Sequence, residues 1–189
     1  MSAYKNLIRE FPGRCSDLLK AYPAGKGTDR DVTQLLAIAS AGITIPFERL
    51  TKKTYPYLFD DYANNPNTSI QFDKRLTSKF LHSDLLSAPE RWYCGSLESV
   101  KGEPDTWPEL RNPRPLPNAK TVYDIVRQMA NALAHGGILT KGDPISQVIF
   151  IARKSRRSEE INYLMVPPDE FLIFLKKWFQ FLEELHFDN

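Results

Sequence analysis

Arg127, Asn131 and His135 recur every fourth residue and combine a cation, an amide and an imidazole. A helix would place all three side chains on one face. A histidine titrates near neutrality and can act as a general acid or base, while an arginine can hold a phosphate and offset its charge. The same pattern also describes an ordinary solvated helix face, and the spacing alone favours that simpler interpretation.

The helix expected to carry these residues runs from about Lys120 to Leu139. Its apolar residues recur at positions i, i+3, i+4, i+7 and i+11 and form a narrow stripe opposite the polar row. These residues are Val122, Ile125, Val126, Met129 and Leu133. Gly136 and Gly137 are expected to end the helix near His135.

Two helices are expected near the N-terminus. Apolar periodicity predicts a helix over residues 28–43, ended by Gly42 and Pro46 because both residue types disfavour a helix interior. An earlier helix is expected around Cys15–Ala21, with Pro12-Gly13 separating it from the N-terminal turn.

The middle of the chain carries weaker signals. Residues 51–72 have the composition of irregular structure, and a short helix is expected from about Asp73. Five prolines between residues 101 and 118 predict a covering loop or an insertion rather than a helix.

The last part of the chain predicts a β-hairpin followed by a helix. Apolar runs at 147–152 and 161–166 are typical of two strands, and a basic tip joins them. Pro168 suits the first position of the following helix, which has a heavily apolar face. We therefore expect a mainly α fold, in which a helical bundle carries a β-hairpin at about 147–166 within a single domain over residues 1–189.

Composition narrows the class of protein. The chain has 189 residues and a net charge of +2, which is too near neutral to argue alone for a nucleic-acid or membrane partner. Two cysteines cannot form a disulfide framework, and the three histidines have no zinc-finger spacing. The N-terminus carries no apolar signal segment. These features predict a reduced, cytoplasmic protein without a structural metal.

The segment Ala130-Asn131-Ala132-Leu133-Ala134-His135-Gly136 resembles the late-helix signature of the HEPN superfamily, the higher-eukaryote and prokaryote nucleotide-binding domain. Members carry an arginine, often followed by a polar residue such as asparagine, and then a histidine. Residues 28–50 and the strand-to-helix passage at 166–171 are also similar to the family. The resemblance implies a HEPN-like helical bundle that acts as a metal-independent endoribonuclease of the toxin or antiphage-defence type, with no cofactor.

Asn131 and His135 match the signature, but Ala130 stands at the position of the family's arginine. Three explanations are open, and we rank them in this order. Ala130 is an engineered knockout of a toxic protein, or the chain is a natural member that binds without cutting. In the third explanation Arg127, one turn earlier on the same face, replaces the missing arginine, although its spacing to His135 exceeds the four to six residues that are usual in the family.

The resemblance also implies a mechanism. His135 would be the general acid or base, an arginine would hold the scissile phosphate, and Asn131 would position the histidine or donate to the phosphate. The 2′-OH of RNA would be the nucleophile, so the products would be a 2′,3′-cyclic phosphate and a 5′-OH.

Related HEPN domains pair their signature helices across a two-fold axis, which predicts a homodimer in which two copies of His135 meet. Ala130 and Ala134 are small enough to let a partner helix approach. An antitoxin, a nucleotidyltransferase or another effector would control such an activity, and no residue chooses among them.

A basic segment is a candidate contact for the RNA backbone. Residues 141–157 carry five basic side chains against one acidic side chain, a local charge of +4. The five are Lys141, Arg153, Lys154, Arg156 and Arg157. They would bind phosphates, or they would form a solubilising loop that protects the edge of the hairpin, and the sequence leaves both interpretations open.

Two functions of other classes remain. A HEPN module without catalysis would bind RNA or a protein partner, and a purely structural domain would only dimerise. Position 130 separates the enzyme from the binding module: a natural arginine there favours the ribonuclease, and a natural alanine favours binding alone.

Overall fold

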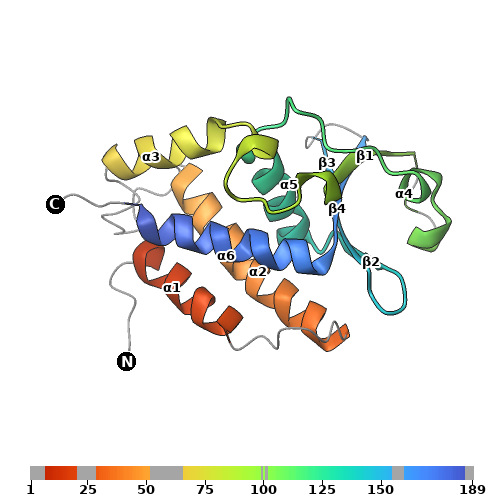
Figure 1. Ribbon diagram of the computed structural model, residues 1–189, viewed down its shortest axis with the longest axis horizontal. Coiled ribbons are helices and arrows are strands. Elements are labelled where there is room, and N and C mark those ends of the chain that lie inside the picture. Colours follow the sequence, from red (N-terminus) through yellow and green to blue (C-terminus); the bar gives the residue numbers. More distant parts are fainter. Residues whose placement is uncertain are drawn as a thin grey trace.

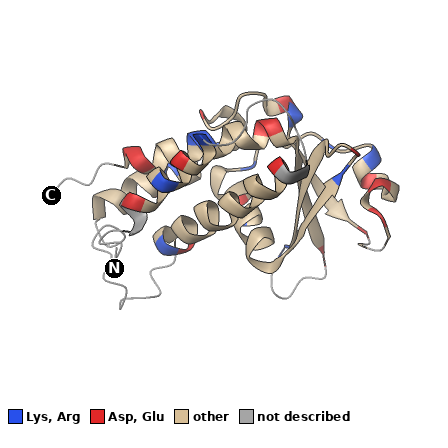
Figure 2. Ribbon diagram, turned by 90° about the horizontal axis from the view of Figure 1, so that it is seen from below, with Lys and Arg blue, Asp and Glu red and all other residues tan. Residues whose placement is uncertain are grey.

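The computed structural model describes residues 7–20, 29–51, 66–98, 100, 102–154 and 160–185. These residues form a mostly helical protein with an antiparallel sheet, as the sequence predicts (Figure 1). The helices are α1 (Leu7–Lys20), α2 (Asp29–Thr51), α3 (Pro66–Thr77), α4 (Pro108–Arg111), α5 (Val122–His135) and α6 (Pro168–Glu184). The strands are β1 (Tyr93–Leu97), β2 (Ile138–Lys141), β3 (Gln147–Arg153) and β4 (Ile161–Val166). In the view of Figure 2, basic and acidic residues are interspersed along the helices, in keeping with the small net charge.

The predicted hairpin is confirmed and lies at the centre of the sheet. β3 and β4 pair antiparallel, with Ile149 opposite Met165. The strand order is β1-β4-β3-β2, so each hairpin strand has one further neighbour that the sequence did not predict. β1 is short and contains a glycine. β2 has only four residues, and its two apolar residues, Ile138 and Leu139, are adjacent, so neither strand shows a clear apolar–polar alternation.

The hairpin strands are apolar on both faces because both faces are covered. Alternate side chains join two different clusters. The cluster under the helices includes Val148, Phe150, Leu164 and Val166. The cluster on the opposite face includes Ile149, Tyr163 and Met165 together with Trp107 and Leu110. The Pro-rich segment therefore covers the second face of the sheet, and it contains a 3₁₀ turn at Pro104–Thr106 and the helix α4.

The prediction that Gly42 and Pro46 end a helix is wrong, because α2 continues through both residues to Thr51. A Cβ on Gly42 would stand 2.3 Å from the ring of Phe179, so the glycine lets α6 approach α2 closely. Pro46 has no N–H to offer the carbonyl of Gly42, and Nε1 of Trp178 donates a hydrogen bond to that oxygen at 3.1 Å. Packing against α6 thus satisfies the group that the proline leaves without its helical partner.

Other helix boundaries also differ from the predictions. The helix expected around Cys15–Ala21 is part of α1, but α1 already begins at Leu7, and Ala21 lies outside the described residues. The break expected at Pro12-Gly13 is wrong, because a proline removes only a single helical hydrogen bond. α3 begins at Pro66, inside the segment expected to be irregular, because a proline at the first helical position has no intrahelical bond to lose. The helix predicted from about Asp73 is confirmed only as the last part of α3, because the chain beyond Thr77 forms a 3₁₀ turn at Phe80–His82.

α6 begins at Pro168 as predicted and runs through the middle of the helical layer (Figure 1). Glu170 in its first turn is only 1% exposed. One carboxylate oxygen of Glu170 accepts hydrogen bonds from the backbone N–H groups of Ser87 at 2.8 Å and Ala88 at 3.0 Å, and from Nε1 of Trp92 at 3.4 Å. These bonds attach the segment that leads into β1 to the start of α6.

Candidate active site

The polar row of the sequence lies on α5, which is fixed at its start by a capping box. Oγ1 of Thr121 accepts a hydrogen bond from the N–H of Asp124 at 3.2 Å, and the N–H of Thr121 donates to Oδ2 of Asp124 at 2.9 Å. The predicted apolar stripe of the helix is buried in the core. The opposite face of α5 is therefore left for Arg127, Asn131 and His135.

The two glycines after His135 end α5, as predicted, and join it to the sheet. Gly136 adopts a left-handed conformation with φ of +70°. Gly137 lies so close to β3 that a Cβ would stand 2.2 Å from the carbonyl oxygen of Ile151. Its own carbonyl accepts a hydrogen bond from the N–H of Ile151 at 2.7 Å. His135 is thus held at the junction of helix and sheet.

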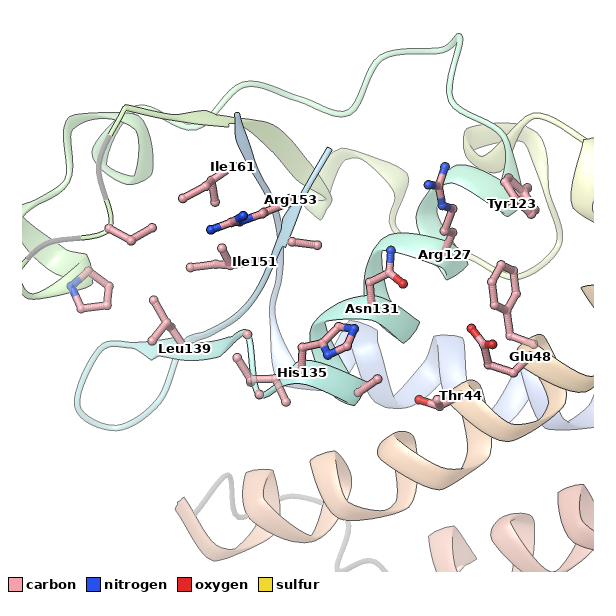
Figure 3. Close-up of a pocket in the computed structure, with 18 of the residues that line it drawn as sticks. Thr44, Glu48, Tyr123, Arg127, Asn131, His135, Leu139, Ile151, Arg153 and Ile161 are labelled. Carbon is pink, nitrogen blue, oxygen red and sulfur yellow. The ribbon is translucent and has the colours of Figure 1, made fainter. Parts of the chain in front are cut away.

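A cleft of about 1120 Å³ opens beside this junction (Figure 3). α2 and α5 form one wall, and the ends of β2, β3 and β4 form the other with Val100, Gly102, Pro104 and Trp107. Small-molecule pockets typically have volumes of about 300–1,000 Å³. The cleft is therefore large enough to hold part of a polymer.

Arg127, Asn131 and His135 follow one another along α5 and line this cleft (Figure 3). Arg127 and His135 are exposed, and Asn131 is half-buried. Within the described part of the chain, none of the three side chains makes a hydrogen bond or an ion pair. The tertiary structure therefore brings the predicted row to a concave surface with its polar atoms available to a ligand.

A family model described as HEPN pEK499 p136 matches residues 1–189. The chain belongs to this HEPN family. HEPN domains are typically ribonucleases. The match confirms the resemblance inferred from the signature segment. Neither a curated protein nor a solved structure matches the chain.

In this HEPN protein Ala130 does not line the cleft. Its side chain is 2% exposed and belongs to the hydrophobic core, together with Val126 and Met129 of the same helix. The expectation that Ala130 is open to a partner helix is therefore wrong. Ala134, one turn later, is exposed and lines the cleft.

The five basic residues proposed for RNA differ in their surroundings. Arg153 is exposed and lines the cleft. Nζ of Lys141 donates a hydrogen bond to the carbonyl oxygen of Leu110 at 2.7 Å, which ties β2 to α4. Nζ of Lys154 lies 2.8 Å from Oε2 of Glu160, and this hydrogen bond lowers the pKa of the Glu160 carboxyl. Two of the five, Arg156 and Arg157, lie outside the described residues.

Other residues of the HEPN cleft were not found from the sequence. Tyr123 precedes Arg127 by one helical turn, and its ring packs against Phe47 of α2 with centroids 5.5 Å apart and planes at 42°. The four-residue spacing from Tyr123 to Arg127 is the signal that could have placed this tyrosine in the row. The contributions of α2, which also include Thr44 and Glu48, are decided by tertiary packing.

The described residues of this HEPN chain contain no group of three or more His, Cys, Asp or Glu side chains that could hold a metal ion. Of the helices whose placement is described, none is both long and apolar enough to cross a membrane.

Proposed function

We propose that this HEPN protein is a metal-independent endoribonuclease that cleaves RNA by attack of a 2′-OH on the adjacent phosphate. The row of Arg127, Asn131 and His135 in the cleft carries the proposal, because its polar groups have no partner elsewhere in the described chain. RNA supplies its own nucleophile, so such a site needs only to move protons and stabilise charge. The products would be a 2′,3′-cyclic phosphate and a 5′-OH.

Each residue of the row has a role that suits its chemistry. His135 takes the proton of the 2′-OH or gives a proton to the leaving 5′ oxygen, since an imidazole can do either near neutral pH. Arg127 holds the scissile phosphate and offsets the charge that develops on it. Asn131 lies between them on the helix and donates its amide N–H to the phosphate or to the histidine.

The surroundings of position 130 favour Arg127 as the phosphate-binding arginine. An arginine at position 130 would start from a buried Cβ in the hydrophobic core, where an unpaired charge is strongly unfavourable. Arg127 starts from the open face and lines the cleft with His135. Of the three explanations for Ala130, we therefore prefer the one in which Arg127 replaces the family's arginine. The other two, in which the arginine was removed by engineering or lost naturally without replacement, rank below it.

A homodimer would complete the acid–base chemistry. One histidine per cleft is few for a reaction in which one proton is removed and another is given. Pairing of two α5 helices across a two-fold axis would bring a second His135 to the same phosphate, and the exposed Ala134 leaves room for the approach.

The biological role that we propose is that of a toxin or an antiphage-defence ribonuclease, held in check by a regulator such as an antitoxin or a nucleotidyltransferase. Induced expression should then arrest growth of the host, and His135→Ala should abolish the arrest. Normal growth on expression of a soluble, folded wild-type chain would contradict this role.

The ribonuclease is tested with purified full-length variants and end-labelled RNA. Arg127→Ala and His135→Ala should each lower the cleavage rate by at least about 100-fold. Arg127→Lys should recover only part of the loss, because an ammonium lacks the two-pronged donors of a guanidinium. Lys176→Ala, which removes an exposed cation from α6, is the control and should leave the rate unchanged.

Analysis of the product ends separates this mechanism from others. A 2′,3′-cyclic phosphate with a 5′-OH supports attack by the 2′-OH, and a 3′-OH with a 5′-phosphate contradicts it.

The alanine at the signature position favours a second candidate, a HEPN module that binds without cutting. Tight RNA binding by the wild type, without cleavage and without an effect of His135→Ala, would support that candidate.

A further inference from the structure

Tyr123 is an exposed aromatic side chain at one end of the polar row. It is 38% exposed, which is unusual for a large apolar side chain in the described part of this chain. It lies on the same face of α5 as Arg127 and lines the same cleft (Figure 3). An aromatic ring left open beside a guanidinium that has no partner among the described residues points to a ligand that is both planar and anionic.

The ring of Tyr123 is supported from within the protein. Phe47 of α2 is 3% exposed, and its ring centroid lies 5.5 Å from that of Tyr123. Aromatic pairs at this separation are mutually stabilising, and the contact limits the orientations that Tyr123 can adopt. Tyr123 therefore offers a firm surface in the cleft rather than a freely rotating side chain.

The position of this ring fits a nucleotide. Tyr123 precedes Arg127 by four residues, which corresponds to about 6 Å along the helix axis. A phosphate held at Arg127 would have the base of an attached nucleotide within reach of the ring. Aromatic side chains stack on bases of unpaired RNA, whereas the bases of a duplex are already stacked on each other.

We propose that Tyr123, supported by Phe47, stacks on the base of a nucleotide next to the phosphate bound at Arg127, so that the cleft selects single-stranded RNA. The proposal rests on the proposed function, since it names the substrate class of the same site. Stacking tolerates any base, so it selects for unpaired nucleotides without fixing a sequence.

The test measures RNA binding separately from cleavage. Fluorescence anisotropy with labelled single-stranded RNA is recorded for the full chain carrying His135→Ala, which leaves the RNA intact. Adding Tyr123→Ala should weaken binding of this RNA by about tenfold or more. Tyr123→Phe should preserve binding, because it keeps the ring and its contact with Phe47. Ile70→Ala, which removes an exposed apolar side chain from α3, should have no effect.

RNAs with one abasic position and a duplex of the same sequence complete the test. One of these abasic RNAs should bind the chain that retains Tyr123 more weakly than the intact RNA does, because the base that stacks on the ring is missing. The Tyr123→Ala protein should bind the same abasic RNA and the intact RNA equally. The duplex should bind weakly to both proteins. Equal binding of single-stranded RNA by the proteins with Tyr123 and with Tyr123→Ala overturns the stacking proposal. A loss of binding in Tyr123→Phe as large as that in Tyr123→Ala also overturns it.

The two proposals fail in different ways. A chain that cleaves RNA but is insensitive to Tyr123→Ala remains a ribonuclease without this platform. A wild-type chain that neither binds nor cleaves any RNA overturns the proposed function, and the stacking proposal with it.

Discussion

Position 130 shows at the scale of one residue how burial changes the interpretation of a signature. In the sequence Ala130 stands beside Asn131, and substitution by arginine looks like a repair of the family's motif. In the structure its Cβ belongs to the core, so the same substitution inserts a charge among apolar side chains.

We expect Ala130→Arg to lower the free energy of unfolding by about 3 kcal/mol or more and not to raise the rate of RNA cleavage. Ala37→Arg is the matched control, because it introduces the same side chain at an exposed alanine of α2 that does not line the cleft. Its cost should be within about 0.5 kcal/mol. Urea denaturation measures both, and a stable, more active Ala130→Arg protein would contradict the assignment of Arg127.

The hydrogen bond from Trp178 to the carbonyl oxygen of Gly42 is a second feature that depends on a single side chain. Trp178→Phe should lower the free energy of unfolding by about 1–3 kcal/mol, because it leaves the buried carbonyl of Gly42 without a partner. In a Pro46→Ala background residue 46 regains an N–H that can bond to this carbonyl, so the same substitution should cost less. Urea denaturation of the wild type, the two single variants and the double variant gives the coupling energy between Trp178 and Pro46. An equal loss of stability from Trp178→Phe in both backgrounds would contradict this explanation.

Cys15 gives a pH-dependent prediction. Burial raises the pKa of its thiol from 9.0 to about 11. The folded chain thus holds this proton more tightly than the unfolded chain, so the thiol's contribution to stability is complete below pH 9 and is lost as the pH rises toward 11. Cys15→Ala should therefore flatten the fall in the free energy of unfolding over this range. An unchanged pH profile would show that the thiol is not protected.

At the scale of elements, the junction of α5 with the sheet decides where His135 lies. The helix ends in a left-handed glycine, and the next glycine passes directly over the backbone of β3. Little freedom remains between the last turn of α5 and the start of β2. The position of the imidazole therefore depends on two residues without side chains.

We expect Gly137→Ala to be more harmful than Gly136→Ala. A Cβ at Gly137 would meet the carbonyl oxygen of Ile151 at 2.2 Å, whereas a Cβ at Gly136 would meet nothing within 4 Å. Gly136→Ala carries only the strain of a left-handed alanine, about 1–2 kcal/mol. Thermal unfolding and RNA cleavage measure the outcome, and we expect Gly137→Ala to lose both stability and activity. The reverse order would show that the close approach to β3 is unimportant.

At the scale of the whole molecule, the proposed chemistry depends on a second copy of the chain. We expect light scattering at micromolar concentration to give twice the mass of one chain. On dilution the specific cleavage activity should fall as the dimer dissociates, because each phosphate would lose its second histidine. A monomer that cleaves RNA at full rate would remove the dimer from the mechanism.

Elements whose signals are local can be predicted from the amino-acid sequence alone. The helix bearing Arg127, Asn131 and His135, the hairpin at 147–166 and the start of α6 at Pro168 follow from spacing between near neighbours. The same spacing placed the polar row opposite the apolar stripe. It could not say whether that row faces open solvent or a concave surface.

Features that depend on residues far apart in the chain could not be predicted from local spacing. α2 continues through Pro46 because Trp178, 136 positions from Gly42, satisfies the carbonyl that the proline cannot. β1 and β2 exist because the hairpin offers them edges to pair with. The cleft exists because α2, α5 and the end of the sheet meet, which places Phe47 under Tyr123 and turns a row of side chains into a candidate site. Local spacing says which face of an element a residue shares, and packing alone says what that face meets.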